Sequence, residues 1–210
     1  MKRPFWKDPF FLGFLIGAAA LTILPFMQRG FLSAPPPRSD LGTWSLVDQA
    51  GRPFGSADLK GKVWIASFFF SRCPTVCPGL QAKLGAIDGH VVDLGDKIQL
   101  VSFSVDPEFD TPDVLRAYAE KRSADPARWH FLTGPRATLE DLLMKRMFVD
   151  MGTAKPVAAD KPDLIDISHS AKFALIDQNG QLRDMWSTDD EGIGQLINAA
   201  RMLAKEGPKP

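Results

Sequence analysis

The sequence predicts an α/β domain in which three layers are built around a central mixed sheet. Residues 62–70 and 97–105 are apolar runs rich in bulky side chains, as in strands that are buried on both faces. Helical patterns alternate with strands along the chain, and a closing hairpin adds antiparallel pairing. Two cysteines follow the first buried strand and open a helix. Together these observations are typical of a thioredoxin-like domain.

The domain is expected to begin with a hairpin and to place a helix after the cysteines. Residues 44–47 and 52–54 flank Asp48-Gln-Ala-Gly51, a turn sequence between two short strands. Residues 79–94 carry apolar side chains at helical spacing, although two glycines within them lower the helix propensity. The first buried strand and this helix therefore enclose the cysteine motif.

Capping and turn residues define the second half of the domain. Thr111 is an N-cap residue with Pro112 at the first helical position, and Thr138 forms an approximate capping box with Asp141. The Asn179-Gly180 dipeptide predicts a hairpin turn. The elements expected here are, in order, a helix at 111–122, a strand at 129–133, a helix capped by Thr138, an irregular insertion at 151–166, strands at 172–177 and 181–186, and a helix at 189–205.

Length and charge limit the classes of function. The chain has 210 residues, which suggests one globular domain and some additional segments. Lysine plus arginine number 25, and aspartate plus glutamate also number 25, so the formal net charge is zero. General nucleic-acid binding needs a basic surface, and the balanced charge argues against it. We therefore expect no nucleic-acid partner.

The N-terminal region contains an uncharged apolar segment, residues 10–27. Its length is close to the minimum for a helix that crosses a membrane, about 17–25 residues. Lys2, Arg3 and Lys7 precede it with only Asp8 opposing them, and this basic excess favours an N-terminus in the cytoplasm. The segment is predicted to anchor the chain in the bacterial inner membrane as a single pass, with the following domain in the periplasm.

Two other interpretations of the apolar segment compete with an anchor. A cleaved signal peptide would also be followed by small residues, here Ser33 and Ala34, but its apolar core typically has only ~7–15 residues. A buried core helix would be apolar along one stripe rather than all round. The predicted division of the chain is a cytoplasmic N-terminus at 1–9, a transmembrane anchor at 10–27, a proline-rich linker at 28–40, a thioredoxin-like domain at 41–205 and a tail at 206–210.

The cysteine motif is Cys73-Pro-Thr-Val-Cys77-Pro78, and the chain has no other cysteine. A structural disulfide framework normally uses more cysteines, so we expect the pair to take part in redox chemistry or metal binding rather than to stabilise the fold. Residues four apart on a helix lie on one side with Cα atoms roughly 6 Å apart, close enough for a disulfide or for both sulfurs to hold one metal ion. The helix N-terminus and Arg72 are expected to lower a thiol pKa.

The donor set indicates which metals are suitable. Two thiolates select soft ions, above all Cu(I), whereas structural zinc usually takes four protein ligands. His90 falls late in the predicted helix and is expected on its solvent-exposed face. His130 lies in a predicted strand and is expected to pack against neighbouring residues. His169 lies in the loop before the strand at 172–177, which in a thioredoxin-like fold faces the cysteine-bearing helix. From its position alone, His169 is equally compatible with a role as a metal ligand and with being an incidental loop residue.

Other candidate groups have structural interpretations that we prefer. Met144, Met147 and Met151 recur at helical spacing, which fits flexible packing in a core better than a copper-handling thioether cluster. Asp106 and Asp110 follow the second buried strand, where turn formation and helix capping are the favoured roles. A role for these two carboxylates behind the metal ligands stays open.

With these residues in hand, the chain resembles the Sco/SenC family of copper chaperones over about residues 41–204. The cysteine motif resembles the family's CPxxCP element. The run Ser104-Val-Asp106-Pro-Glu-Phe-Asp110-Thr-Pro112 is similar to its VDPxxDTP loop, and His169-Ser-Ala-Lys-Phe-Ala-Leu-Ile-Asp177 to its metal-histidine strand. One position departs from the pattern, because many members carry an aspartate where this chain has Thr75, which removes a charge beside the site.

The resemblance implies a ligand set and a biological role. Cys73, Cys77 and His169 would bind Cu(I) and Cu(II), and the cysteine pair would also cycle to a disulfide. The protein would assist assembly of the dinuclear copper site in cytochrome c oxidase subunit II. Other periplasmic copper carriers or thiol reductants are the further partners that this role implies. A membrane-anchored metallochaperone, rather than an enzyme, is the favoured function.

The alternative is a periplasmic thiol–disulfide oxidoreductase that reduces cysteines of the apo-oxidase or of another client. Dedicated thioredoxin-type enzymes use CxxC and a proline before the facing strand. Here the spacing is CxxxC, no proline occurs between Asp163 and Asp177, and His169 occupies that neighbourhood. A peroxidase is weaker still, because Ser71 and Arg72 do not supply its Thr-x-x-Cys arrangement. A transient mixed disulfide with a client stays compatible with either function.

Overall fold

The computed structural model describes residues 10, 13–14, 16–19, 21–23, 34–73, 76–152, 155–158, 161–166 and 171–207. The chain divides into two compact units, residues 1–34 and 35–210. Those residues of the segment 10–23 that are described are helical. Within the described ranges, no helix reaches the length and apolar character that a membrane crossing requires. The anchor at 10–27 therefore stays a prediction.

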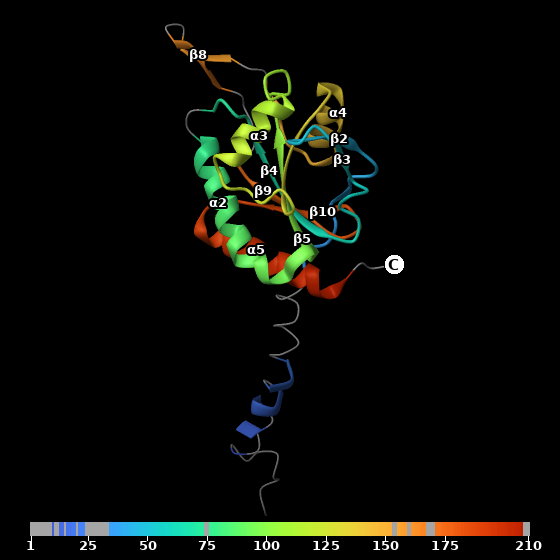
Figure 1. Cartoon of the computed structure of the whole chain (residues 1–210). Helices are drawn as coiled ribbons and strands as arrows, with labels where there is room; N and C mark the ends of the chain where they lie inside the picture. The colour runs from blue at the N-terminus through green and yellow to red at the C-terminus, as the bar shows by residue number, and fades with distance from the viewer. Residues whose placement is uncertain are drawn as a thin grey trace, which may run out of the picture. The chain divides into compact units, whose positions relative to one another are not determined.

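A mixed sheet of eight strands forms the centre of the second unit, with strand order β1-β10-β9-β4-β5-β6-β2-β3 (Figure 1). β4, β5 and β6 pair in parallel, and the other neighbouring strands pair antiparallel. This arrangement confirms the predicted thioredoxin-like α/β fold. The strands are β1 Ser39–Asp40, β2 Ser45–Asp48, β3 Pro53–Gly55, β4 Val63–Phe69, β5 Ile98–Ser104, β6 Trp129–Thr133, β9 Phe173–Ile176 and β10 Gln181–Trp186.

The central strands β4 and β5 are buried at every position, as their apolar sequences predict. They pair in continuous parallel register from Val63 opposite Ile98 to Phe69 opposite Ser104. Because both strands end at the same level, the loops that follow them leave the sheet at one edge. The cysteine loop and the loop with Asp106 and Asp110 are therefore neighbours.

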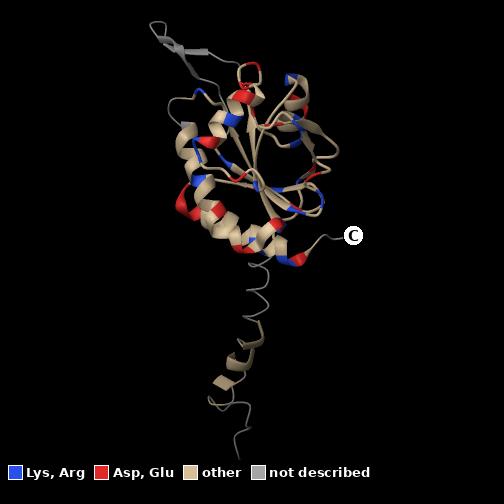
Figure 2. Ribbon diagram, in the orientation of Figure 1, with Lys and Arg blue, Asp and Glu red and all other residues tan. Residues whose placement is uncertain are grey.

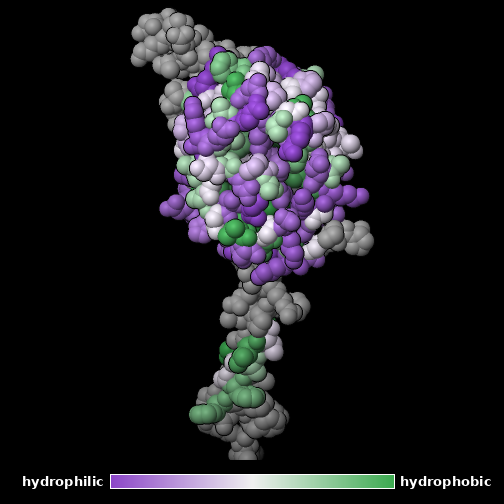
Figure 3. Space-filling model, viewed as in Figure 1, coloured by the Kyte–Doolittle hydropathy of each residue, from purple (hydrophilic) through white to green (hydrophobic). Residues whose placement is uncertain are grey.

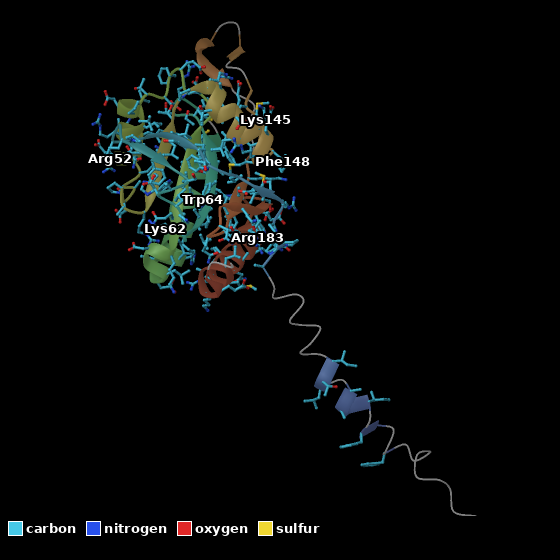
Figure 4. The ribbon with its side chains drawn as sticks, turned by 90° about the vertical axis from the view of Figure 1, so that its right-hand side faces the viewer. Arg52, Lys62, Trp64, Lys145, Phe148 and Arg183 are labelled. Carbon is cyan, nitrogen blue, oxygen red and sulfur yellow. The ribbon has the colours of Figure 1, made fainter. Side chains whose placement is uncertain are left out.

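Helices cover both faces of the sheet. α2 and α3 lie on one face, and α5 packs beside α2, while α4 and the π-helical segment that continues it lie on the opposite side (Figures 1 and 4). Their bounds are α2 Val76–Val91, the 3-10 helix η2 Val92–Lys97, α3 Pro112–Glu120, α4 Arg136–Glu140, the π-helix η3 Asp141–Arg146 and α5 Asp190–Glu206. The three layers agree with the predicted architecture.

A buried polar network ties α2 to the sheet. Gln81 Nε2 donates to Ser67 Oγ at 3.2 Å, and Ser102 Oγ donates to Gln81 Oε1 at 3.1 Å. The hydroxyls of Ser67 and Ser102 are 2.8 Å apart, and Trp129 Nε1 donates to Ser102 Oγ at 2.9 Å. Buried polar groups stabilise a fold only when they are paired, and these four side chains pair with one another. The network fixes the helix that begins beside the cysteines.

The other face of the central strands is packed with aromatic rings. Trp64 and Phe68 of β4 lie 6.1 and 6.3 Å from Phe103 of β5, measured between ring centroids. Trp44, which precedes β2, packs against both Trp64 and Phe103. Trp64 is buried inside the unit and is seen between Arg52 and Arg183 in the side view (Figure 4). Large rings buried on this face supply much of the apolar area that stabilises the sheet.

The hairpin between β9 and β10 confirms the Asn179-Gly180 turn. Gly180 has a φ of 77°, a conformation that glycine adopts without steric cost. Asp177 Oδ1 accepts from the amides of Asn179 and Gln181, at 2.9 and 3.0 Å. β1 adds to the outer side of β10, so regular pairing already begins at Ser39, within the segment predicted as linker.

The expected helix start at Thr138 is wrong. α4 begins at Arg136 with Pro135 as its N-cap, and the amide of Thr138 donates to the Pro135 carbonyl. Proline fixes φ near −65°, which suits a helix start and places Thr138 inside the first turn, where its hydroxyl caps nothing. The helix then continues as η3, and Phe148 beyond its end has a φ of 58° (Figure 4).

The segment 151–166 also differs from the irregular insertion expected from its prolines. β7 Lys155–Ala158 and β8 Lys161–Asp166 pair antiparallel as a separate two-stranded sheet. In a two-stranded ribbon each strand is an edge, and proline is tolerated where the ladder needs no amide. Pro156 and Pro162 are therefore compatible with this hairpin.

Two of the three histidines are described. His90 is exposed on α2, as expected for a solvated face. His130 is packed within the sheet, stacked on Phe54 with ring centroids 4.2 Å apart, and its Nε2 lies 3.1 Å from Gln99 Oε1. Burial lowers the pKa of His130 to about 4, because the charged imidazolium would lose its hydration. The packing interpretation of His130 is confirmed.

His130 should make the domain sensitive to acid. An unfolded chain binds a proton at this histidine near pH 6.5, but the folded chain binds it only near pH 4. The unfolded state therefore binds more protons in this window, and stability falls as the pH falls from about 6.5 to about 4. We predict that His130→Phe makes the unfolding free energy, measured by urea titration, less dependent on pH across this window. His90→Gln is the matched control, and an equal flattening in both variants would contradict the prediction.

Candidate metal centre

Cys73 and Cys77 lie where the central strand β4 passes into α2. The amide of Cys73 donates to the Phe70 carbonyl at 3.2 Å, which turns the chain sharply after the strand. α2 begins at Val76, so Cys77 is in its first turn. The Cys77 amide donates to Cys73 Sγ at 3.4 Å. The structure thus brings the two sulfur side chains together at the start of a helix, as the spacing predicts.

Both cysteines are thiols, and both are buried, with Cys73 8% exposed and Cys77 0%. The pKa of Cys77 is raised well above its ordinary value. The hydrogen bond with Cys73 is the largest cause, followed by burial and by the negative charges at Cys73 and Asp110. A lowered pKa, as the sequence suggested, is therefore wrong for Cys77. A buried thiol beside a second sulfur cannot ionise easily without a cation.

Arg72 is paired with Asp106 and is not among the causes of the pKa shift of Cys77. Arg72 Nε donates to Asp106 Oδ2 at 2.8 Å, and the guanidinium lies 4.5 Å from the centre of the Phe109 ring. Asp106 is itself buried, and its amide donates to Ser104 Oγ at 3.0 Å. The residue before Cys73 is thus held by the loop that follows β5.

Asp110 forms a second and deeper link between the same two loops. Its carboxylate is fully buried and accepts from the Ser71 amide at 3.1 Å, from the Ser71 hydroxyl, and from Ser104 Oγ at 2.5 Å. Burial raises its pKa, although the hydrogen bonds from Ser104 and Ser71 oppose that shift. Thr111, not Asp110, caps α3. The side chain of Asp110 therefore orients the cysteine loop.

Tyr118 is a site residue that the sequence reasoning missed. Its ring stacks on Phe69, the last residue of β4, with centroids 4.9 Å apart, and the Arg122 guanidinium lies 3.3 Å from the ring centre. Burial raises the pKa of Tyr118, with smaller contributions from Cys77, Asp110 and Cys73. Its buried hydroxyl has no hydrogen-bond partner within the described part of the chain. Tyr118 is the only tyrosine in the sequence and lies on α3, and this rarity is the one feature of the sequence that could have drawn attention to it.

The third predicted ligand, His169, lies outside the described residues. The chain is described again from Ala171, and β9 begins at Phe173, with Ala174 opposite Ala66 of β4. β9 therefore begins near the edge of the sheet where β4 ends. Across the described ranges, no three histidine, cysteine or acidic side chains gather as a metal cluster.

The methionines behave as core residues in two of three cases. Met147 and Met151 are buried, at 0% and 5% exposure, whereas Met144 is 42% exposed on η3. The described part of the site thus consists of two thiols, two buried carboxylates behind them and a tyrosine at the side. Two thiols of this kind favour a soft metal ion over a hard one.

Comparison with protein families and curated proteins gives one consistent result. A family model described as SCO1/SenC matches residues 34–205. The mitochondrial protein SCO2 of Saccharomyces cerevisiae is 36% identical over 149 residues, which is 68% of this chain and 46% of that protein. The chain therefore spans less than half the length of this relative.

Solved structures resemble the same unit. ScoI of Bradyrhizobium japonicum, solved with copper bound, is 27% identical with a TM-score of 0.60, covering 77% of this chain and 98% of that one. BsSco, described as a member of the Sco family of cytochrome c oxidase assembly proteins with a disulfide switch, has a TM-score of 0.69 at 24% identity. That second match covers 82% of this chain and 98% of the other, and it shows a common fold.

Removing the Asp110 carboxylate should loosen the cysteine loop. Asp110→Ala leaves the buried Ser71 amide and two hydroxyls without their acceptor, which costs about 1–3 kcal/mol of unfolding free energy. We also predict faster reaction of the thiols with a soluble thiol reagent, measured in the native protein. Asp113→Ala, which removes an exposed aspartate from α3, is the matched control. Equal stability and equal thiol reactivity in the two variants would show that Asp110 does not hold the loop.

Proposed function

The chain belongs to the SCO1/SenC family, and from this premise we propose that it carries copper as cargo on Cys73 and Cys77 and delivers it during assembly of a cytochrome c oxidase. One observation carries the proposal above all. The two sulfurs meet at the start of α2, where the Cys77 amide contacts Cys73 Sγ at 3.4 Å. Family membership supports copper as the cargo, since ScoI of Bradyrhizobium japonicum binds it.

The protonation of the thiols suits a carrier. With its pKa raised, Cys77 holds its proton in the empty site and is a weak nucleophile. A copper ion supplies the positive charge that favours the thiolates, and two soft sulfur donors suit Cu(I). Loading the site therefore releases protons, and acid favours release of the metal.

His169 is the proposed third ligand. An imidazole nitrogen beside two thiolates gives Cu(I) a low-coordinate site and also suits Cu(II). The position of β9 supports this assignment, because the strand that follows His169 begins next to the C-terminal part of β4. Asp106 and Asp110 would hold the cysteine loop in the shape that the metal needs, through Arg72 and Ser71.

The cellular setting follows from the sequence and is part of the proposal. Residues 10–27 would anchor the chain in the bacterial inner membrane, with the N-terminus in the cytoplasm and the copper-binding domain in the periplasm. The client would be the dinuclear copper site of cytochrome c oxidase subunit II. Other periplasmic copper carriers or thiol reductants would load the site or reduce it.

A thiol–disulfide reductase is the second candidate, and the exposure of the cysteines is the observation that favours it. Cys73 is 8% exposed and Cys77 is 0% exposed, so Cys73 lies slightly nearer to the surface than Cys77. The reductase function would need the Cys73 sulfur to be reachable and the Cys77 sulfur to be sheltered. In such a pair, the reachable thiolate attacks a client disulfide and forms a mixed disulfide. The sheltered thiolate then displaces the client's second thiol, which leaves the protein oxidised and the client reduced.

Substituting either cysteine should abolish tight copper binding. We predict that Cys73→Ser and Cys77→Ser each lose the one copper per chain that the reduced wild type binds, because a hydroxyl is a poor ligand for a soft ion. Metal analysis after dialysis measures the stoichiometry. Met144→Leu, which removes an exposed sulfur outside the pair, should keep it. Tight binding in either serine variant would favour a purely redox role.

His169 should be needed chiefly for the oxidised metal. His169→Ala is expected to weaken Cu(II) binding and to change its visible absorption, because imidazole is the donor that Cu(II) prefers in this set. Cu(I) binding through the two sulfurs should suffer less. His90→Ala, on the exposed part of α2, serves as the control. An unchanged Cu(II) spectrum in His169→Ala would remove this histidine from the ligand set.

A further inference from the structure

A groove of about 510 Å³ lies next to the cysteine pair, between α2 and the end of α3. Its first lining residue is Pro78, which directly follows Cys77, and the groove continues along α2. Trp129 of β6 also lines it. The lining residues are Pro78, Gln81, Ala82, Gly85, Lys121, Arg122 and Trp129. A client bound here would contact Pro78, the residue that follows Cys77.

Arg122 differs from the other arginines of the described domain in having no carboxylate partner there. Between residues 34 and 207, every other arginine pairs with an aspartate or glutamate within 4.0 Å. Among the described residues, no carboxylate pairs with Arg122, which instead lies over the Tyr118 ring and donates to the Tyr118 carbonyl at 3.0 Å. Charges of both signs are otherwise interspersed over the unit (Figure 2). The groove thus carries an unbalanced positive charge.

Lys121 adds to this charge. It is exposed and lines the same groove, and no acidic residue belongs to the lining. Partial burial lowers the pKa of Arg122 from its usual value, which reflects the cost of holding this cation away from water. A bound anionic group would offset that cost. The chemistry of the rim therefore selects negative charge.

Gly85 keeps the groove open. A glycine inside an α-helix costs about 1 kcal/mol relative to alanine, so its presence in the middle of α2 is unfavourable for the helix itself. A Cβ built at Gly85 would already lie 3.4 Å from the Trp129 ring, and any longer side chain would extend into the groove. Gly89, one turn later on α2, has nothing within 4 Å of such a Cβ. The glycine at 85 makes room for a ligand.

We propose that this groove binds an extended acidic peptide segment of the client protein, which places the client's own metal-binding or cysteine residues beside Cys77. The floor of Ala82, Gly85 and Trp129 offers contact to the peptide's apolar parts, and Lys121 and Arg122 pair with its carboxylates. The surrounding surface of the unit is largely hydrophilic (Figure 3). The inference deepens the proposed function and rests on it for the identity of the client.

The test uses fluorescence anisotropy with the full chain purified in detergent. The probes are a labelled peptide of about ten residues rich in aspartate and glutamate, and neutral and basic versions of the same length, all without cysteine. Without cysteine, binding cannot depend on thiol chemistry. We expect the acidic peptide to bind most tightly of the three. Its affinity should fall as the salt concentration rises to about 0.15 M, because salt screens the charge pairs and the Debye length is then near 8 Å.

Two matched pairs of variants locate the binding. Lys121→Glu should weaken binding of the acidic peptide at least about tenfold, whereas Lys97→Glu, at an exposed lysine that does not line the groove, should not. Gly85→Leu should block the groove, whereas Gly89→Leu on the same helix should not. Equal affinities within both pairs, or equal affinity for the basic peptide, would overturn the proposal.

Copper loading of the same proteins separates this inference from the proposed function. We expect Lys121→Glu and Gly85→Leu to bind copper with the wild-type stoichiometry, since neither residue is a proposed ligand. If the wild type binds copper but not the acidic peptide, the proposal of peptide binding in the groove is wrong and the carrier role is unaffected. If the wild type binds the peptide but no copper, the carrier role is wrong and the proposal of peptide binding in the groove is unaffected.

Discussion

The buried carboxylate of Asp110 joins the two loops on which the site is built. β4 and β5 end at the same level, with Phe69 opposite Ser104, and their loops emerge side by side. Nothing in parallel strand pairing alone would fix how those loops are arranged beyond the sheet. Asp110 does so by accepting from Ser71 in one loop and Ser104 at the end of the other strand. Its position therefore sets the direction in which the chain enters the cysteine motif.

Burying this carboxylate is unfavourable in isolation, and the raised pKa of Asp110 records that cost. The three donors around it compensate, because a buried acceptor with satisfied hydrogen bonds avoids most of the desolvation penalty. The same charge also raises the pKa of Cys77. Asp110 thus orients the cysteine loop and adds to the hydrogen bond with Cys73 and the burial that chiefly raise the pKa of Cys77. A cation that entered the site would lower two costs, the ionisation of the thiols and the burial of the Asp110 charge, because it would lie beside two thiolates and near that carboxylate.

The sequence predicted most strands of the central sheet, most helices and the approach of the two cysteines from local patterns, but it did not predict β1, β7 or β8. Residues 63–69 form a buried strand because their composition permits little else, and Thr111 with Pro112 starts α3 as expected. Two errors are local, namely the helix start expected at Thr138 and the irregular insertion expected at 151–166. The sequence also did not predict that Arg72 pairs with Asp106 of another loop. The sequence also predicted a lowered thiol pKa. The pKa of Cys77 is raised instead, by its hydrogen bond with Cys73 and by burial, and neither can be predicted from the spacing of the two cysteines.

α2 connects the parts of this site that distant contacts create. Cys77, Gln81 and Gly85 recur at intervals of four, which places them along one side of the helix. Cys77 faces its partner sulfur, Gln81 binds the sheet through Ser67 and Ser102, and Gly85 leaves room beside Trp129. A helix free to slide would separate the thiols from the groove. Because Gln81 lies between Cys77 and Gly85, the polar network that fixes α2 holds the cysteine pair and the groove in one constant relation.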